Sequence, residues 1–122
     1  RLSPSRVLLV DDEPLIRALM ADELRAVGAI VLEATSAVEA WSLLLSGERI
    51  DLLFSDLRMP GDFDGVGLAT RVRDCYPWIP IILTSGNPPP LNLSRFGRFL
   101  QKPYSIIRAV QVVLEHLPQA RP

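Results

Sequence analysis

The chain of 122 residues is long enough for one domain with a hydrophobic core, and we expect a single domain over residues 1–122 with its core at about 5–117. Hydrophobic residues make up 48% of the chain and charged residues 22%, a composition typical of globular proteins. The formal net charge of −1 provides no field that would attract nucleic acid or an anionic membrane surface. No apolar run approaches the roughly 20 residues that a membrane-spanning helix requires, so we expect neither direct nucleic-acid binding nor a membrane partner.

The first half of the chain alternates short apolar runs with segments of helical period. Strands are predicted at 7–10 and near 30–34, and the helix between them begins at Pro14 and ends at Gly28. Its apolar face consists of Ile16, Met20, Leu24 and Val27. Ser36 and Glu39 have the spacing of a capping box at the start of a second helix, which Gly47 ends. The apolar positions of that helix are Ala37, Ala40, Trp41 and Leu44.

The second half continues the alternation, although its connections are less regular. A strand at 50–55 leads into Asp56, and a loop then precedes a helix whose apolar positions are Val66, Ala69, Val72 and Cys75. Cys75 is the only cysteine, and we expect it to pack in the core. A strand at 79–83 precedes Pro88–Pro90, which oppose a helix, so any helix there must be short.

The last predicted elements are a strand at 98–101 and a helix that Ser105 caps. The apolar positions of this helix are Ile107, Val110, Leu114 and Leu117. Apolar runs that alternate with helical segments are typical of repeated βαβ units that cover both faces of a parallel sheet. The pattern therefore predicts an α/β protein with five strands and four secure helices.

Polar side chains of particular kinds stand at the ends of four predicted strands. These residues are Asp11, Asp12, Asp56, Thr84 and Lys102. Because ligands of an open α/β sheet bind outside the carboxyl ends of the strands, we expect all of them to share one pocket. Crowded carboxylates repel each other, and a hard divalent cation offsets that repulsion. Mg²⁺ is the natural candidate, since it favours carboxylate and phosphate oxygens.

The same pocket suits a transferred phosphoryl group. The metal and Lys102 would neutralise its equatorial oxygens, and Thr84 would donate a hydrogen bond. A carboxylate can attack phosphorus in line and form an aspartyl phosphate. Asp56 is the preferred nucleophile because it ends a central strand, between the other groups.

Four ordered segments carry a resemblance to a known family. VLLVDDEP, FSDLRMPGDFDG, IILTSG and FLQKPY resemble the signature segments of the two-component response regulator receiver domain. The resemblance spans nearly the whole chain and implies a flavodoxin-like, doubly wound parallel sheet with strand order 2-1-3-4-5. It implies a receiver of the stand-alone or hybrid-kinase type, because the fourth helix is shortened or irregular.

The resemblance also implies a role for each polar residue. Asp56 matches the phosphoacceptor, Asp12 the direct metal ligand, Asp11 the neighbour that holds metal-bound water, Thr84 the switch hydroxyl and Lys102 the phosphate-binding lysine. The backbone carbonyl of Arg58 matches a further metal ligand. Phe99 matches the aromatic that rotates inward when Thr84 turns toward the phosphoryl group, but it lacks a phenolic hydroxyl.

Two segments depart from the family pattern. The loop 59–65 carries one residue more than the commonest version of this turn, which suggests a small change in kinase docking. Only 17 residues separate Thr84 from Lys102, in place of the usual full fourth helix and fifth strand. This shortening puts the usual output face in doubt and favours a stand-alone or hybrid-kinase context over a transcription factor.

By resemblance, the partners are a sensor histidine kinase or a histidine phosphotransfer protein, and a downstream protein or attached output domain. We expect a cytoplasmic protein, which fits the single cysteine. We expect no enzyme activity beyond self-catalysed phosphorylation and dephosphorylation of the domain.

Some of the residues also have a purely structural interpretation. Phe99 is equally well explained as packing on an edge strand, and Tyr104 as packing beside the last helix. Trp41 and Trp78 are expected to pack in the core or at its rim. His116 is expected at the surface near a helix C-terminus, and we do not assign it as a phosphodonor.

Three alternative functions remain open at this stage. A receiver fold can serve as a phosphate-independent interaction module. A phosphohydrolase of the haloacid-dehalogenase type also uses an aspartyl nucleophile, but it expects a second aspartate where Arg58 stands. A flavodoxin-like cofactor carrier needs a loop of amides for phosphate after the first strand, where Asp11, Asp12 and Glu13 would instead repel it.

Overall fold

The computed structural model describes residues 4–86 and 93–118. Five strands form one parallel sheet: β1 (Arg6–Val10), β2 (Ile30–Ala34), β3 (Leu52–Asp56), β4 (Ile81–Ser85) and β5 (Arg98–Gln101). The described helices are α1 (Pro14–Ala26), α2 (Ala37–Leu45), α3 (Gly65–Cys75) and α4 (Ile106–His116), together with a short 3₁₀ turn at Leu93–Arg95. The sheet order β2-β1-β3-β4-β5 confirms the predicted topology.

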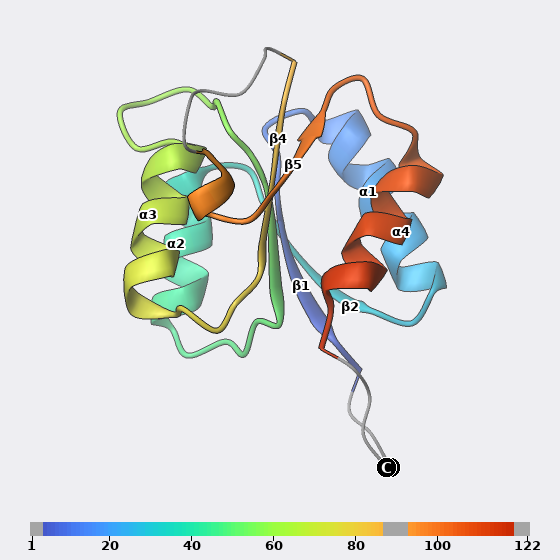
Figure 1. The fold of residues 1–122 in the computed structure, drawn as a ribbon, viewed down its shortest axis with the longest axis horizontal. Helices are drawn as coiled ribbons and strands as arrows, with labels where there is room; N and C mark the ends of the chain where they lie inside the picture. The colour runs from blue at the N-terminus through green and yellow to red at the C-terminus, as the bar shows by residue number, and fades with distance from the viewer. Residues whose placement is uncertain (1–3, 87–92, 119–122) are drawn as a thin grey trace.

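The helices cover the sheet on both faces, as Figure 1 shows, with α2 and α3 on one side and α1 and α4 on the other. Two hydrophobic clusters fill the spaces between the layers. One lies on the α2 and α3 side and includes Leu53 and Leu83, while the other lies on the α1 and α4 side and includes Phe54 and Ile82. Because successive strand side chains point to opposite faces, a strand buried on both faces must be apolar throughout. Strand β1 meets that demand after Arg6, and β3 and β4 meet it until their last two residues.

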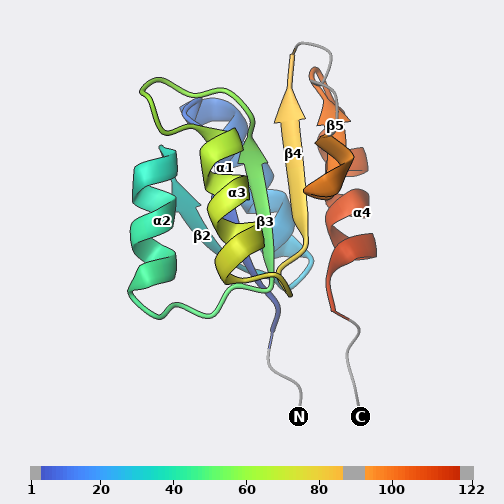
Figure 2. The same ribbon diagram turned by 60° about the vertical axis from the view of Figure 1, so that its left-hand side comes forward.

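The register of the sheet brings the polar ends of the strands to one edge. Asp56 on β3 is paired with Thr84 on β4, and Ser85 is paired with Gln101, the residue before Lys102. Figure 2 shows the arrowheads of β3, β4 and β5 pointing toward the same end of the molecule. The chain after β3 is tied to the neighbouring strand as well, because Leu57 donates its amide hydrogen to the Thr84 carbonyl at 2.7 Å.

Side-chain caps define the starts of three helices. Ser36 accepts a hydrogen bond from the Glu39 amide at 3.1 Å, as the predicted capping box requires. The Glu39 carboxylate reaches one residue further back than expected and accepts from the Thr35 amide at 2.7 Å. Ser105 caps α4 by accepting from the Arg108 amide, and Asp64 caps α3, a role that the sequence reading missed.

The buried face of two helices differs from the prediction. Cys75 is exposed, and so is Val66, while α3 buries Gly65, Leu68, Ala69 and Val72. The predicted positions were each three residues apart, and at about 100° per residue four such positions span half the circumference of a helix. They therefore cannot all face the sheet, and the expectation that Cys75 packs in the core is wrong.

A similar correction applies to α4, in which Ile107 and Leu114 are exposed and Ala109, Val110, Val112 and Val113 are buried. Its polar residues Arg108, Gln111 and Glu115 share one face, but the apolar arc opposite them is wider than the face that packs, and the prediction took the wrong edge of that arc. Val27 is also exposed, because it follows the end of α1. Trp78 is 71% exposed and is therefore not a core residue.

Strand β4 begins two residues later than predicted and contains Thr84 and Ser85. Pro80 explains the start, because proline has no amide hydrogen for the ladder, although its carbonyl accepts from the Leu53 amide at 3.0 Å. The triple proline at 88–90 lies outside the described residues. The 3₁₀ turn at Leu93–Arg95 is the only helical element described between β4 and β5.

Gly65 offers a direct test of how closely α3 packs against β3. A Cβ atom at Gly65 would lie 2.0 Å from the Asp56 carbonyl oxygen and 2.8 Å from the Leu57 Cα. We expect Gly65→Ala to lower the free energy of unfolding by about 1–3 kcal/mol, because backbone atoms cannot move aside cheaply. Gly86→Ala is the matched control, since a Cβ there meets no atom within 4 Å. Urea denaturation of both variants checks this, and equal stabilities would contradict the close packing.

Candidate metal centre

Three carboxylates converge at the carboxyl edge of the sheet. Asp11 and Asp12 follow β1, Asp56 ends β3, and one carboxylate oxygen from each lies within 4.8 Å of the others. Asp11 is 3% exposed and Asp56 6% exposed, whereas Asp12 faces solvent. The structure thus brings together the three carboxylates that the sequence predicts, two of them buried and one open to solvent.

Asp11 is held by its backbone as well as by its side chain. Its amide donates to the Ala34 carbonyl at 3.1 Å, and Arg17 Nη1 donates to its carbonyl oxygen at 2.7 Å. One carboxylate oxygen, Oδ1, accepts a hydrogen bond from the Glu13 amide at 2.8 Å. The other carboxylate oxygen, Oδ2, faces Lys102 Nζ at 3.5 Å.

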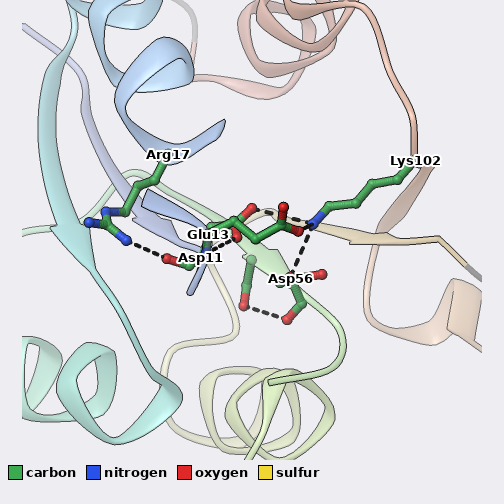
Figure 3. A network of polar contacts seen from close by, with 6 residues as sticks. Asp11, Glu13, Arg17, Asp56 and Lys102 are labelled. Carbon is green, nitrogen blue, oxygen red and sulfur yellow. Dashed lines mark hydrogen bonds and ion pairs between the residues drawn. The ribbon is translucent and has the colours of Figure 1, made fainter. Parts of the chain in front are cut away.

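Lys102 connects the acidic groups, as Figure 3 shows. Its Nζ lies 3.1 Å from Asp56 Oδ2, 3.5 Å from Asp11 Oδ2 and 3.3 Å from Glu13 Oε1. The ammonium group has three hydrogens, so these contacts use its whole donor capacity. A single cation thus offsets three carboxylates in the absence of a metal.

Burial raises the pKa values of the two buried acids in spite of the contact with Lys102. Burial, followed by the nearby charges of Asp11 and Asp12, raises the pKa of Asp56 from 3.8 to about 6 despite the hydrogen bond from Lys102. Burial also raises the pKa of Asp11. For Lys102, burial would lower the pKa, but the hydrogen bond and charge of Asp56 outweigh it and raise the pKa. The site has an excess of negative charge.

Two buried hydroxyl groups border the acidic cluster without a hydrogen-bond partner among the described residues. They are Thr84 Oγ1 and the Tyr104 hydroxyl. Thr84 is fully buried beside Asp56 in the sheet register. The Tyr104 ring packs edge-on against Phe54, with its centroid 6.0 Å away, and burial raises the pKa of its hydroxyl to about 12. A buried hydroxyl without a partner costs stability, so these groups mark positions where a partner is missing.

The remaining predicted residues lie at the margin of the site. Arg58 is exposed in the turn after Asp56. Phe99 is partly buried on β5 and packs against the hydrophobic cluster on the α2 and α3 side. A cavity of about 360 Å³ opens beside Lys102, lined by Glu13, Ile16, Gly86, Pro103 and Tyr104 as well.

Sequence reasoning missed the contributions of Glu13 and Arg17. Glu13 is a third acidic contact of Lys102, and Arg17 holds the Asp11 carbonyl. Arg17 begins the second turn of α1, but its bond to the Asp11 carbonyl depends on the rotamer of a long side chain, which sequence spacing does not determine. No periodic pattern would have selected Glu13 from an acidic run.

The donor set fits a hard divalent cation such as Mg²⁺. Carboxylate oxygens from Asp11, Asp12 and Asp56 are the ligands that Mg²⁺ prefers, and the exposed position of Asp12 leaves room for the waters that Mg²⁺ retains. A bound cation would also offset the repulsion between the carboxylates of Asp11, Asp12 and Asp56, which lie within 4.8 Å of one another. None of the helices in residues 4–86 and 93–118 is long and apolar enough to span a membrane.

Comparisons with known proteins agree with this geometry. A family model for the response regulator receiver domain matches residues 7–113. The transcriptional regulatory protein GlrR of Escherichia coli strain K12 is 32% identical over 98% of this chain and 28% of its own length. Sensor kinase CckA of Brucella abortus is 38% identical over 91% of this chain and 12% of its own length. The chain thus spans less than a third of these relatives.

Solved structures show the same fold. The receiver domain from the hybrid histidine kinase CckA has a TM-score of 0.80 and 35% identity, covering 93% of this chain and 100% of that one. The response regulator TrrA from Thermotoga maritima, in complex with Mg(2+)-BeF, has a TM-score of 0.83 and 29% identity, covering 93% of this chain and 99% of that one.

The burial of Asp56, which raises its pKa, predicts an unusual effect of this residue on stability. Because the pKa of Asp56 is about 6 in the folded protein and 3.8 ordinarily, the folded state binds more protons between these values. The stability of the metal-free protein should therefore fall as the pH rises through this interval. At about pH 7 we expect Asp56→Asn to raise the free energy of unfolding by about 1–3 kcal/mol.

Urea denaturation in a chelator, at a series of pH values, measures this difference, which should shrink toward pH 4. Added Mg²⁺ should stabilise the wild type more than Asp56→Asn, and so reduce or reverse the difference between their unfolding free energies. A metal-free wild type that is more stable than the variant at neutral pH would contradict a raised pKa of Asp56 in the folded protein.

Proposed function

The chain belongs to the response regulator receiver domain family, and we propose that it accepts a phosphoryl group on Asp56 with Mg²⁺ and changes its partner contacts in response. One observation carries the proposal: the Asp56 carboxylate is largely buried beside the other acids of the cluster, with Lys102 Nζ 3.1 Å from its Oδ2. A carboxylate in that position has a cation in place to balance incoming phosphoryl oxygens.

The chemical step is a displacement at phosphorus. An Asp56 carboxylate oxygen forms the new bond to phosphorus, and the bond from phosphorus to the donor breaks. The departing group leaves with the electron pair and takes up a proton. Lys102 is placed to neutralise charge on the transferred group, and Mg²⁺ when bound supplies the remaining positive charge.

The proposed metal ligands are Asp12, Asp56 and the backbone carbonyl of Arg58, with Asp11 acting through metal-bound water. The hydrogen bonds of Asp11 support this division, because its Oδ1 already accepts from the Glu13 amide. Asp12 is exposed, so its carboxylate is accessible to a hydrated ion. The complex of the Thermotoga maritima relative with Mg(2+)-BeF supports the choice of metal.

We propose that Thr84 and Phe99 change position after phosphorylation. The Thr84 hydroxyl is buried beside Asp56 without a partner, and a phosphoryl oxygen on Asp56 would provide an acceptor for it. When the Thr84 side chain turns toward the phosphoryl group, it would vacate space toward Phe99, which lies on the neighbouring strand β5 and is only partly buried. Phosphate at the pocket would thus alter the edge of the sheet at β5.

The proposed phosphodonor is a sensor histidine kinase or a histidine phosphotransfer protein, and the altered surface would be recognised by a downstream protein or an attached output domain. The relatives include both sensor kinases and transcriptional regulators. We further propose a single cytoplasmic receiver domain over residues 1–122, without direct nucleic-acid or membrane binding and without turnover of an external substrate.

Intact mass spectrometry tests the central proposal. After incubation with Mg²⁺ and acetyl phosphate, we expect one phosphoryl adduct on the wild type. We expect none on Asp56→Asn, because an amide cannot form the acyl phosphate, and none in a chelator. An adduct that persists on Asp56→Asn would contradict the site assignment, and a folded, Mg²⁺-binding protein that forms no adduct would favour a phosphate-independent interaction module.

A second test concerns the hydroxyl of Thr84. Thr84→Val keeps the shape of the side chain and removes a buried hydroxyl that has no partner, so we expect the unphosphorylated protein to gain about 1 kcal/mol of stability. The same variant should still form the Asp56 adduct but show a smaller change in the amide spectrum of β5 on phosphorylation. Loss of stability, or an unchanged spectral response, would contradict the proposed switch.

A further inference from the structure

Asp12 is the proposed metal ligand with the least support from its own side chain. It is exposed, and no side chain among the described residues forms a hydrogen bond or ion pair with its carboxylate. An exposed, unrestrained carboxylate must lose rotational freedom to bind a metal. The direction in which Asp12 projects therefore depends on the backbone that carries it.

That backbone is fixed by Arg17. Arg17 Nη1 donates to the Asp11 carbonyl oxygen at 2.7 Å, and this carbonyl belongs to the planar peptide unit that joins Asp11 to Asp12. Because the unit is planar, a hydrogen bond that holds its carbonyl oxygen restricts rotation of the whole peptide unit. The Asp11 amide, bonded to the Ala34 carbonyl at 3.1 Å, fixes the preceding peptide unit in the same way.

Arg17 is itself held in place. Its Nε lies 3.2 Å from Glu33 Oε1 on β2, and its side chain is only 16% exposed. The other carboxylate oxygen of Glu33, Oε2, lies 3.1 Å from Arg25 Nη2 on the same helix as Arg17. The planar guanidinium of Arg17 can therefore bond Glu33 and the Asp11 carbonyl with different nitrogens, an arrangement that a lysine could not reproduce.

We infer that Arg17 is a positioning residue for the metal centre, which orients the peptide unit before Asp12 so that the Asp12 carboxylate meets the same ion as Asp56. The inference rests on the proposed function, because it assumes that these carboxylates bind Mg²⁺. Arg17 touches neither the metal nor the phosphoryl group. Figure 3 shows its contact with Asp11, on the side of the site away from Lys102.

Arg25 supplies a matched control within the chain. Arg17→Met and Arg25→Met each remove one positive charge and one ion pair with Glu33, but only Arg17→Met removes the bond to the Asp11 carbonyl. Isothermal titration calorimetry with MgCl₂ alone measures the affinity. We expect Arg17→Met to weaken Mg²⁺ binding about tenfold, as is usual for residues that orient metal ligands. Arg25→Met should change it by no more than about twofold.

Two further measurements separate positioning from charge. In high salt, simple attraction or repulsion by Arg17 would be screened, whereas an orientation effect would persist, so the ratio of wild-type to variant affinity should be unchanged. In amide spectra of the metal-free protein, Arg17→Met should shift the Asp12 resonance and Arg25→Met should not. Unfolding free energies of the two variants should be similar, since each loses one contact with Glu33 and one bond to a backbone carbonyl, that of Asp11 for Arg17 and that of Val31 for Arg25.

Each outcome bears on a separate statement. A wild type that does not bind Mg²⁺ would contradict the proposed function and remove the basis of this inference with it. A wild type that binds Mg²⁺, together with an Arg17→Met variant of equal affinity, would overturn the inference alone. An effect that disappears in high salt, or equal effects of both substitutions, would also overturn it. If Arg17→Met fails to fold, Arg17→Lys retains the charge, and unchanged affinity together with an unchanged Asp12 amide resonance would overturn the positioning role.

Discussion

The mutual repulsion of carboxylates at one edge of the sheet is the constraint on which the rest of the site depends. A parallel sheet places the ends of β1 and β3 side by side, so Asp11, Asp12 and Asp56 cannot avoid one another. Lys102 offsets part of this repulsion from the end of β5, although burial still raises the pKa of Asp56 to about 6. The fold therefore holds Asp11 and Asp56 together at a buried edge, where Lys102 contacts both carboxylates.

The topology and the site could be predicted because they follow from patterns with a simple period. The buried strands contain the apolar runs 7–10, 52–54 and 81–83, and polar residues follow each run. The helix faces were predicted less well, because the apolar arc of α4 is wider than the face that packs, and only packing against α1 and the sheet selects Ala109 and Val113 for burial. Cys75 was misplaced for the related reason that positions three residues apart drift around a helix.

Within the site, the residues at strand ends were predictable, but the residues that hold them were not. Lys102 and Asp56 lie 46 positions apart in the chain, and the sheet topology alone was enough to bring them together. By contrast, the bond from Arg17 to a backbone carbonyl depends on the rotamer of a long side chain and on Glu33 from another strand. Such contacts leave no periodic signal, because any exposed helix carries arginines at similar spacing.

Both ends of the loop between Asp56 and α3 are held at the carboxyl ends of β3 and β4. Leu57 is bonded to the Thr84 carbonyl at its start, and Gly65 lies directly against the Asp56 carbonyl at its end. Because the ends are fixed independently of what lies between them, an extra residue adds only a little closure entropy, which grows slowly with loop length. The loop can therefore be lengthened or shortened while Asp56 keeps its position. The surface that the loop presents and the placement of Asp56 are thus set separately, within a few residues of each other.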